Sequence, residues 1–139
     1  MRGMIYTHKV QYYETDKMGI THHSNYVRWM EEARVAYLAK VGWDYARLES
    51  LGVISPVVAV DVSYKKTTTF SDVVTVDVGV DEFKGVRLKM KYLMTDEQGE
   101  VVCEAHSEHC FLDGEGKPIR LQKTYPEFYS ILKTAAEED

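Results

Sequence analysis

The chain has 139 residues, of which 45% are hydrophobic, and its formal net charge is −5. This length is typical of one domain with a substantial core, so we expect a single domain over residues 1–139. The acidic balance disfavours generic binding to nucleic acids or anionic membranes, both of which favour a basic face. We therefore expect neither of these partners.

The first third of the chain predicts one strand and two helices. Residues 5–13 are rich in Val and Tyr and indicate a strand. Over residues 24–41, apolar side chains recur at steps of three and four, which predicts a long helix. Ser24 or Asn25 would cap its N-terminus. A short second helix is expected over about residues 44–50.

The rest of the chain alternates apolar and polar residues, which predicts strands with one buried face. The alternating segments are residues 58–65, 74–81, 86–94 and 101–111. Turn residues between the later segments favour an antiparallel meander, and residues 127–136 indicate a C-terminal helix. The pattern predicts an α+β fold in which a five-stranded antiparallel sheet wraps around one long central helix. Because one helix cannot cover five strands, we also expect self-association.

The two cysteines, Cys103 and Cys110, fall in one predicted strand. Seven residues of extended chain span about 23 Å, whereas a disulfide joins Cα atoms no more than about 7 Å apart. The two thiols therefore do not pair with each other. The N-terminal residues lack the apolar run of a signal peptide, and no segment approaches the length of a membrane span. A cytoplasmic location is expected.

Residues 12–26, YYETDKMGITHHSNY, hold the most informative chemistry of the sequence. The carboxylate of Asp16 lies seven residues before His23, where the long helix is predicted to begin. A helix N-terminus presents unpaired N–H groups and a partial positive charge. A carboxylate beside such donors suits attack on a carbonyl, which suggests acyl transfer or hydrolysis. The alternative is that Asp16 only forms a turn, as Asp often does.

This pattern resembles the hotdog-fold acyl-CoA thioesterases of the 4-hydroxybenzoyl-CoA thioesterase type. The resemblance rests on Asp16, Gly19, the run His23-Ser24-Asn25-Tyr26 and the run Glu31-Glu32-Ala33-Arg34. Weaker matches continue to residues 112–121. In two places the chain departs from the family pattern, because Thr67-Thr68-Thr69 replaces an expected Pro and His22 replaces an aromatic residue.

The resemblance implies a hotdog fold and hydrolysis of an acyl-CoA thioester, with CoA as part of the substrate and no other cofactor. Asp16 would be the nucleophile or the general base, and the amide near His23 would hold the oxyanion. It also implies a homodimer with active sites at its interface, which often assembles further into a tetramer, and it allows an acyl carrier protein as the thioester donor. The alternatives are a hydratase or dehydratase of the same fold, with His22 or His23 as base, and a non-catalytic acyl-CoA-binding module. Glu31 is the reserve catalytic carboxylate.

Further residues are candidates for shaping the site and binding the substrate. Gly19 would supply a turn with positive φ or a close approach to substrate. Tyr13, His22 and Tyr26 would line the acyl pocket, although aromatics beside a helix often belong to the core. Three cations on one strand face would bind the CoA phosphates, unless they only solubilise the surface: Arg87, Lys89 and Lys91.

No metal site is expected. Adjacent histidines in a loop diverge, so His22 and His23 would not share a metal ion with Asp16, and no third ligand has suitable spacing nearby. His106 and His109, three apart on a predicted strand, would point to opposite faces of the sheet.

Overall fold

Five strands form one antiparallel sheet in the computed structural model of this chain, which describes residues 3–138. In chain order, the strands are β1 (Met4–Lys9), β2 (Val57–Tyr64), β3 (Val73–Phe83), β4 (Arg87–Thr95) and β5 (Val101–Cys110). Their order across the sheet is β1-β3-β4-β5-β2. The predicted meander is confirmed for β3, β4 and β5. Strand β2 lies outside this meander; it pairs with β5 and forms an edge of the sheet.

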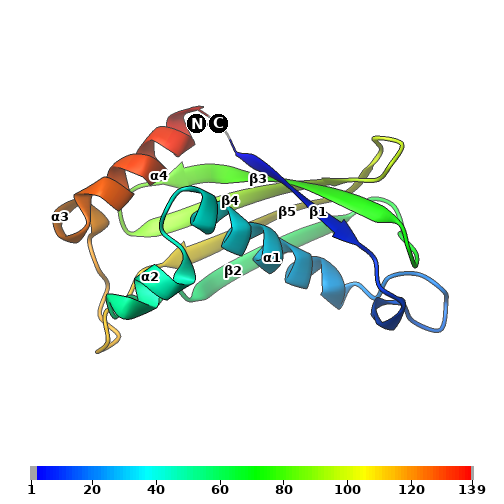
Figure 1. Cartoon of the computed structure of the whole chain (residues 1–139), viewed down its shortest axis with the longest axis horizontal. Coiled ribbons are helices and arrows are strands. Elements are labelled where there is room, and N and C mark those ends of the chain that lie inside the picture. Colours follow the sequence, from blue (N-terminus) through cyan, green and yellow to red (C-terminus); the bar gives the residue numbers. More distant parts are fainter. Residues whose placement is uncertain (1–2, 139) are drawn as a thin grey trace.

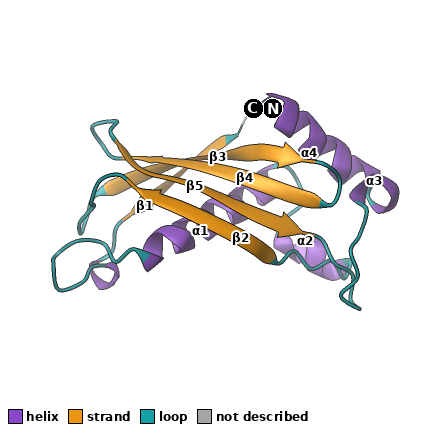
Figure 2. Ribbon diagram, turned by 180° about the vertical axis from the view of Figure 1, so that it is seen from behind, coloured by secondary structure: helices purple, strands orange, loops and turns teal. Residues whose placement is uncertain are grey.

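All helices lie on one face of the sheet, and the other face is uncovered (Figures 1 and 2). They are η1 (Tyr12–Glu14), α1 (Ser24–Lys40), α2 (Tyr45–Ser50), α3 (Leu121–Thr124) and α4 (Pro126–Glu138). The long helix α1 has 17 residues, which agrees closely with the expected range of 24–41, and it lies across one face of the sheet (Figure 1). However, α4 adds 13 residues that also pack against β3, so a second helix shares the covering of the sheet. Within residues 3–138, no helix is both long and apolar enough to span a membrane.

Two details near the N-terminus differ from the sequence prediction. The first strand ends at Lys9 rather than at Tyr13, because residues 12–14 turn as the 3₁₀ helix η1. The N-cap of α1 is His23, and Ser24 is already the first helical residue. Asn25 does not cap the helix, because its side-chain amide donates to the carbonyl oxygens of Glu14 and His22.

The core lies between the helices and the inner face of the sheet. The alternation in β3 places four valines on this face, each fully buried: Val74, Val76, Val78 and Val80. Trp29 and Tyr37 of α1 are also fully buried. Trp43 stacks on Phe128 of α4 with ring centroids 4.7 Å apart, which ties that helix to the same core. Burial of these aromatic rings contributes much of the apolar stabilisation.

Strand β5 carries a polar pair on its inner face. Ser107 and His109 are both buried, with Ser107 Oγ 2.7 Å from His109 Nε2 and 2.6 Å from the hydroxyl of Tyr92. Burial, with a smaller effect of the Arg34 charge, lowers the pKa of His109 to about 4. His106 lies on the outer face beside Asp61 of β2, so the two histidines point to opposite faces as predicted. Cys103 and Cys110 are both free thiols, also as predicted.

The edge strand β2 leaves apolar side chains exposed. Val57, Val58, Val60 and Tyr64 are 42–47% exposed, although the first three would be buried in most strands. An exposed edge of this kind also offers unpaired backbone N–H and C=O groups to another strand.

Candidate active site

Asp16 begins a short loop that is closed at its base by backbone hydrogen bonds. The amide of Asp16 donates to the carbonyl oxygen of Ile20 at 2.9 Å, and the amide of Gly19 donates back to Asp16 at 3.0 Å. Gly19 has a φ of +81°, which favours glycine and agrees with the expected turn. Asp16 Oδ1 accepts from the amide of Met18 at 2.8 Å, so Asp16 does form a turn. Its Oδ2 has no hydrogen-bond partner within residues 3–138, so one oxygen remains available.

The start of α1 lies beside this loop. The amide of His22 is already engaged, because it donates to the carbonyl oxygen of Glu14 at 2.8 Å. The amide of His23 has no acceptor in the part of the chain that the structure describes. A donor at a helix N-terminus with no intramolecular acceptor can hold an oxyanion. His23, rather than His22, therefore presents the amide suited to that role.

The two histidine rings are both exposed and lie against each other. Their centroids are 4.3 Å apart, so the expectation that adjacent side chains diverge is wrong here. His22 Nδ1 lies 2.8 Å from Ser24 Oγ, which holds its ring against the first helical turn. Tyr64 of β2 donates from its hydroxyl to the carbonyl oxygen of His23 at 3.1 Å. This bond ties the edge strand to the candidate site.

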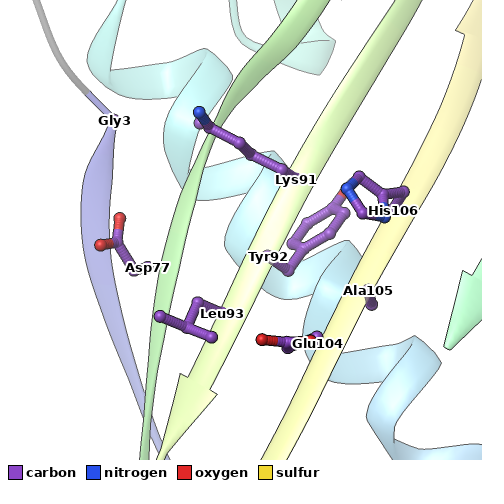
Figure 3. A pocket seen from close by; sticks show the side chains of 9 residues that line it. Gly3, Asp77, Lys91, Tyr92, Leu93, Glu104, Ala105 and His106 are labelled. Carbon is purple, nitrogen blue, oxygen red and sulfur yellow. The ribbon is translucent and has the colours of Figure 1, made fainter. Parts of the chain in front are cut away.

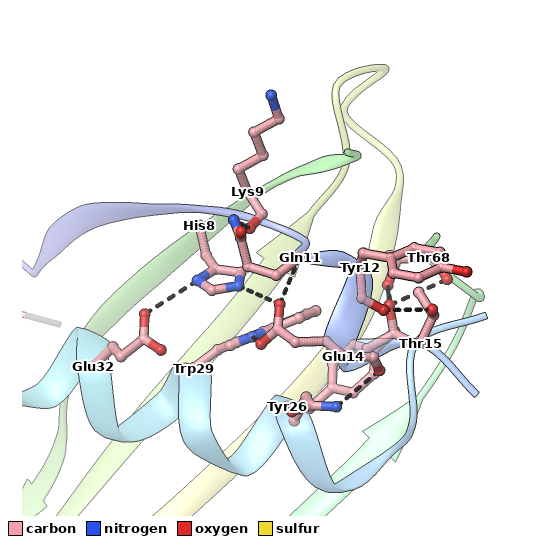
Figure 4. Close-up of polar contacts among 12 residues, drawn as sticks. His8, Lys9, Gln11, Tyr12, Glu14, Thr15, Tyr26, Trp29, Glu32 and Thr68 are labelled. Atoms are coloured by element: carbon pink, nitrogen blue, oxygen red, sulfur yellow. Dashed lines mark hydrogen bonds and ion pairs between the residues drawn. The ribbon is translucent and has the colours of Figure 1, made fainter. Parts of the chain in front are cut away.

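Glu14 organises the site, although the sequence analysis missed it. The residue is 4% exposed, and its carboxylate accepts from the amide of Gln11 and from Trp29 Nε1, both at 2.8 Å (Figure 4). His8 Nε2 lies 2.8 Å from the same carboxylate. Burial raises the pKa of Glu14, but the hydrogen bonds from Gln11, His8 and Trp29 outweigh it and hold that pKa below its usual value. The sequence signal was only an acidic residue two positions before Asp16.

The contact of Glu14 with His8 continues toward the middle of α1. His8 Nδ1 lies 3.1 Å from Glu32 Oε1 (Figure 4). The same Glu32 oxygen accepts from the hydroxyl of Tyr6 at 2.6 Å. Burial and this bond to Glu32 raise the pKa of Tyr6 to about 12. The chain of contacts fixes β1 against α1 close to the Asp16 loop.

A set of threonine contacts anchors the other side of the loop. Thr68 Oγ1 lies 2.6 Å from Thr21 Oγ1 and 2.9 Å from the hydroxyl of Tyr26. Thr69 donates from its hydroxyl to the carbonyl oxygen of Gly19 at 2.6 Å. The threonine run that replaces the expected Pro therefore holds the Asp16 loop in place.

The candidate acyl-pocket aromatics occupy two different environments. Tyr26 is 3% exposed and packs against Trp29 and Tyr64, so it is part of the core wall behind the helix start. Tyr13 is 80% exposed and lies beside the loop, as does Met18 at 76%. Tyr13 and Met18 are near Asp16 in the chain and exposed, whereas Tyr26 is buried. Their contact with substrate stays a prediction.

The three candidate phosphate-binding cations lie on the outer face of β4, apart from the Asp16 loop. Arg87 lies 3.8 Å from Glu108, and Lys89 lies 3.8 Å from Asp81, so carboxylates already face both cations. Lys91 lines a pocket of about 410 Å³ on this face (Figure 3). That pocket is lined by Gly3, Asp77, Gly79, Lys91, Tyr92, Leu93, Glu104, Ala105 and His106. The structure does not bring these cations together with Asp16.

Within residues 3–138, no three His, Cys, Asp or Glu side chains are grouped so that they could hold a metal ion. Glu31, the reserve carboxylate, is exposed about two turns into α1 and lies 3.8 Å from Arg34. Among the described residues, no hydrogen bond or ion pair joins Glu31 to the Asp16 loop. Asp16 therefore remains the carboxylate best placed beside a helix N-terminus.

Comparison with known proteins gives one consistent result. Residues 10–132 match the model of the thioesterase-like superfamily. The YneP protein of Bacillus subtilis, provisionally named an acyl-CoA thioesterase, is 35% identical over 91% of this chain and 93% of its own length. A DHNA-CoA thioesterase structure from Staphylococcus aureus superposes with a TM-score of 0.91 at 35% identity, covering 99% of this chain and 95% of that one. The 4-hydroxybenzoyl-CoA thioesterase of a Pseudomonas species is 25% identical over 86% of this chain and 89% of its own length.

Proposed function

This chain belongs to the thioesterase-like superfamily and has the hotdog fold, and we propose that it hydrolyses acyl-CoA thioesters to a carboxylic acid and free CoA. One observation carries the proposal. Asp16, with one carboxylate oxygen unengaged, lies two residues after Glu14, whose carbonyl oxygen accepts from the amide of His22 and the side chain of Asn25 at the helix start. The same helix start presents the amide of His23, which has no acceptor within residues 3–138. The relatives reported above support the same reaction.

The reaction can follow two routes from this geometry. In both, the thioester carbonyl oxygen lies against the His23 amide, which stabilises the negative charge that develops there. In the first route, the Asp16 carboxylate attacks the carbonyl carbon, CoA leaves as a thiolate, and water hydrolyses the resulting anhydride. In the second, Asp16 takes a proton from the water that attacks the carbonyl carbon, and CoA again leaves as a thiolate. A single turnover in ¹⁸O-labelled water separates them, because label enters the Asp16 side chain only through the anhydride.

The test of the function is thiol release from a panel of acyl-CoAs. The panel includes DHNA-CoA and 4-hydroxybenzoyl-CoA, which the names of two relatives suggest, together with short and long aliphatic acyl-CoAs. We expect release by the wild type and a loss of about 100-fold or more in Asp16→Asn and Asp16→Ala, which is the scale of losing a general base. Glu31→Gln is the matched control on α1 and should keep its activity.

Other outcomes of the same panel identify the alternatives. Activity that survives both Asp16 variants would move the reaction to Glu31 or His22. A change in substrate absorbance without thiol would indicate a hydratase or dehydratase. Binding without any conversion would indicate an acyl-CoA-binding module. Thiol release only from an acyl carrier protein would change the thioester donor and leave the chemistry intact.

We also propose that the protein is a homodimer that pairs β2 with β2 of a second copy. The support is the exposed apolar row Val57, Val58, Val60 and Tyr64 on an edge strand. Tyr64 is bonded to His23, so such an interface would border the candidate site. Association of dimers into tetramers is a further proposal, for which the uncovered outer face of the sheet leaves room. The two unpaired cysteines support a reducing, cytoplasmic setting.

A further inference from the structure

His8 of β1 lies between two carboxylates. Its Nε2 is 2.8 Å from Oε1 of Glu14, and its Nδ1 is 3.1 Å from Oε1 of Glu32 (Figure 4). Only 12% of the His8 side chain is exposed, so solvent screens these contacts less than it would at the surface. A neutral imidazole carries one N–H and one lone pair, and it can donate to only one of the two oxygens. The doubly protonated ring donates to both.

Both carboxylates act as acceptors, which leaves the His8 ring as the donor. Glu14 accepts from the indole N–H of Trp29 at 2.8 Å. Burial alone would raise the pKa of Glu14, but its hydrogen bonds lower that pKa, so the carboxylate is ionised at neutral pH. Glu32 Oε1 accepts from the hydroxyl of Tyr6 at 2.6 Å. The His8 ring also lies against Trp29 with ring centroids 4.7 Å apart, and an indole face favours a cation.

The charge between the two carboxylates is set by His8. Within residues 3–138, His8 forms no ion pair other than those with Glu14 and Glu32. Strand β3, which pairs with β1, places the apolar Val74 opposite His8. Burial and the bond to Glu32 raise the pKa of Tyr6 to about 12, so its hydroxyl stays protonated in the pH range of an enzyme assay.

Glu14 joins this cluster to both parts of the candidate site. Its backbone carbonyl oxygen accepts from the amide of His22 at 2.8 Å, and the next amide along the chain is that of His23. Asp16 follows Glu14 by two residues. A displacement of Glu14 would therefore change the position of Asp16 relative to the helix start. Misplacement of a reacting group by about 1 Å can cost about 100-fold in rate.

We infer that His8 is a positioning residue for the proposed reaction. As an imidazolium it bridges Glu14 and Glu32, ties β1 to α1, and so holds Asp16 in place beside the His23 amide. The inference rests on the proposed function, because the position of Asp16 matters to the rate only if Asp16 carries the reaction. When the ring loses one proton, one nitrogen presents a lone pair to a carboxylate, and that contact becomes repulsive. Activity should therefore fall as the pH rises.

The pH dependence of kcat is the first test. In the wild type, kcat corrected for uncatalysed hydrolysis should fall about tenfold as the pH rises from roughly 6 to 10, a range in which histidines in proteins change charge. Glu32→Gln should remove this fall. The amide of the new side chain can donate to the lone pair of a neutral His8 ring, whose other nitrogen still donates to Glu14. A fall of equal size in Glu32→Gln and the wild type would overturn the inference.

Substitution of His8 tests the same role at one pH. At the pH where the wild type is most active, His8→Gln should lower kcat about tenfold and change KM less than twofold, because the substrate contacts remain while the position of Asp16 is lost. His106→Gln removes a histidine on the outer face of the sheet and is the matched control. It should leave both constants unchanged. An equal loss in the control, or no loss in His8→Gln, would refute the positioning role.

NMR keeps the inference testable without turnover. With ¹⁵N-labelled histidine, both ring nitrogens of His8 should carry a proton in the pH range where kcat is highest. The amide signals of Asp16 and His23 should shift as the ring loses its proton, and these shifts should be absent in Glu32→Gln. Amide signals that do not follow His8 would refute the positioning role. If they follow His8 but no substrate releases thiol, the proposed function fails and the link from His8 to Asp16 stands.

Discussion

Removal of the Glu14 carboxylate should disrupt both stability and the candidate site. In Glu14→Ala, the amide of Gln11, the indole N–H of Trp29 and the ring of His8 all lose a partner 2.8 Å away. A hydrogen bond to a charged group contributes about 1.5–3 kcal/mol, and leaving buried donors unpaired adds to the loss. Because the three contacts share one carboxylate and are not additive, we expect a destabilisation of about 3–5 kcal/mol. For a chain of this length, that lowers Tm by roughly 10 °C.

Glu32→Ala is the matched control, since Glu32 contacts the same His8 but its side chain is 39% exposed. It should cost only about 1 kcal/mol, as expected for a solvent-accessible pair. Thermal unfolding followed by circular dichroism measures both variants at equal protein concentration. Thiol release should fall further in Glu14→Gln than in Glu32→Gln at a temperature where both are folded. The reason is that the Glu14 carboxylate accepts from the amide of Gln11 and so fixes the turn that leads into the Asp16 loop.

The pH dependence gives this prediction a second readout. The pKa of Glu14 is lower in the folded state than its usual value of 4.5, so its contribution is present above pH 4.5 and is lost as pH falls below that value. The stability difference between wild type and Glu14→Gln should therefore narrow in acid. The reasoning would be refuted if Glu14→Ala shifted Tm no more than Glu32→Ala, or if the difference grew as pH fell.

Three further predictions address other parts of the molecule. Burial lowers the pKa of His109 to about 4 in the folded protein, against 6.5 when unfolded. The free energy of unfolding should therefore fall by about 3 kcal/mol as the pH drops from 6.5 to 4. Denaturant unfolding should show this loss in the wild type and not in His109→Gln. Burial raises the pKa of Cys103 to about 12. In the native protein, a thiol reagent should therefore label Cys110 well before the buried Cys103. Mass spectrometry of the labelled peptides measures the two rates of labelling. Val60→Glu places a charge on the exposed edge of β2 and should convert the proposed dimer to a monomer in light scattering, with loss of thiol release. A dimer that persists in this variant would move the proposed interface elsewhere.

Much of the candidate site was readable from the sequence because its parts are adjacent in the chain. Asp16, Gly19 and His23 lie within eight residues, so turn chemistry and the start of a helix were enough to group them. Glu14 was missed because its role depends on His8 and Trp29, which approach it only when β1 packs against α1. An acidic residue in a polar loop carries no local sign of burial.

The sequence by itself determined the local structure of this protein. Period-two alternation placed the buried and exposed faces of β3, β4 and β5, and helical spacing located α1, because both patterns repeat over a few residues and record which side chains face the core. The tertiary structure decided what no local pattern encodes. It placed β2 beside β5 as an exposed edge, and it brought His8 of β1 next to Glu32 of α1. Such contacts join residues far apart in the chain, and they form because packing the whole sheet against its helices lowers the free energy more than any local preference does.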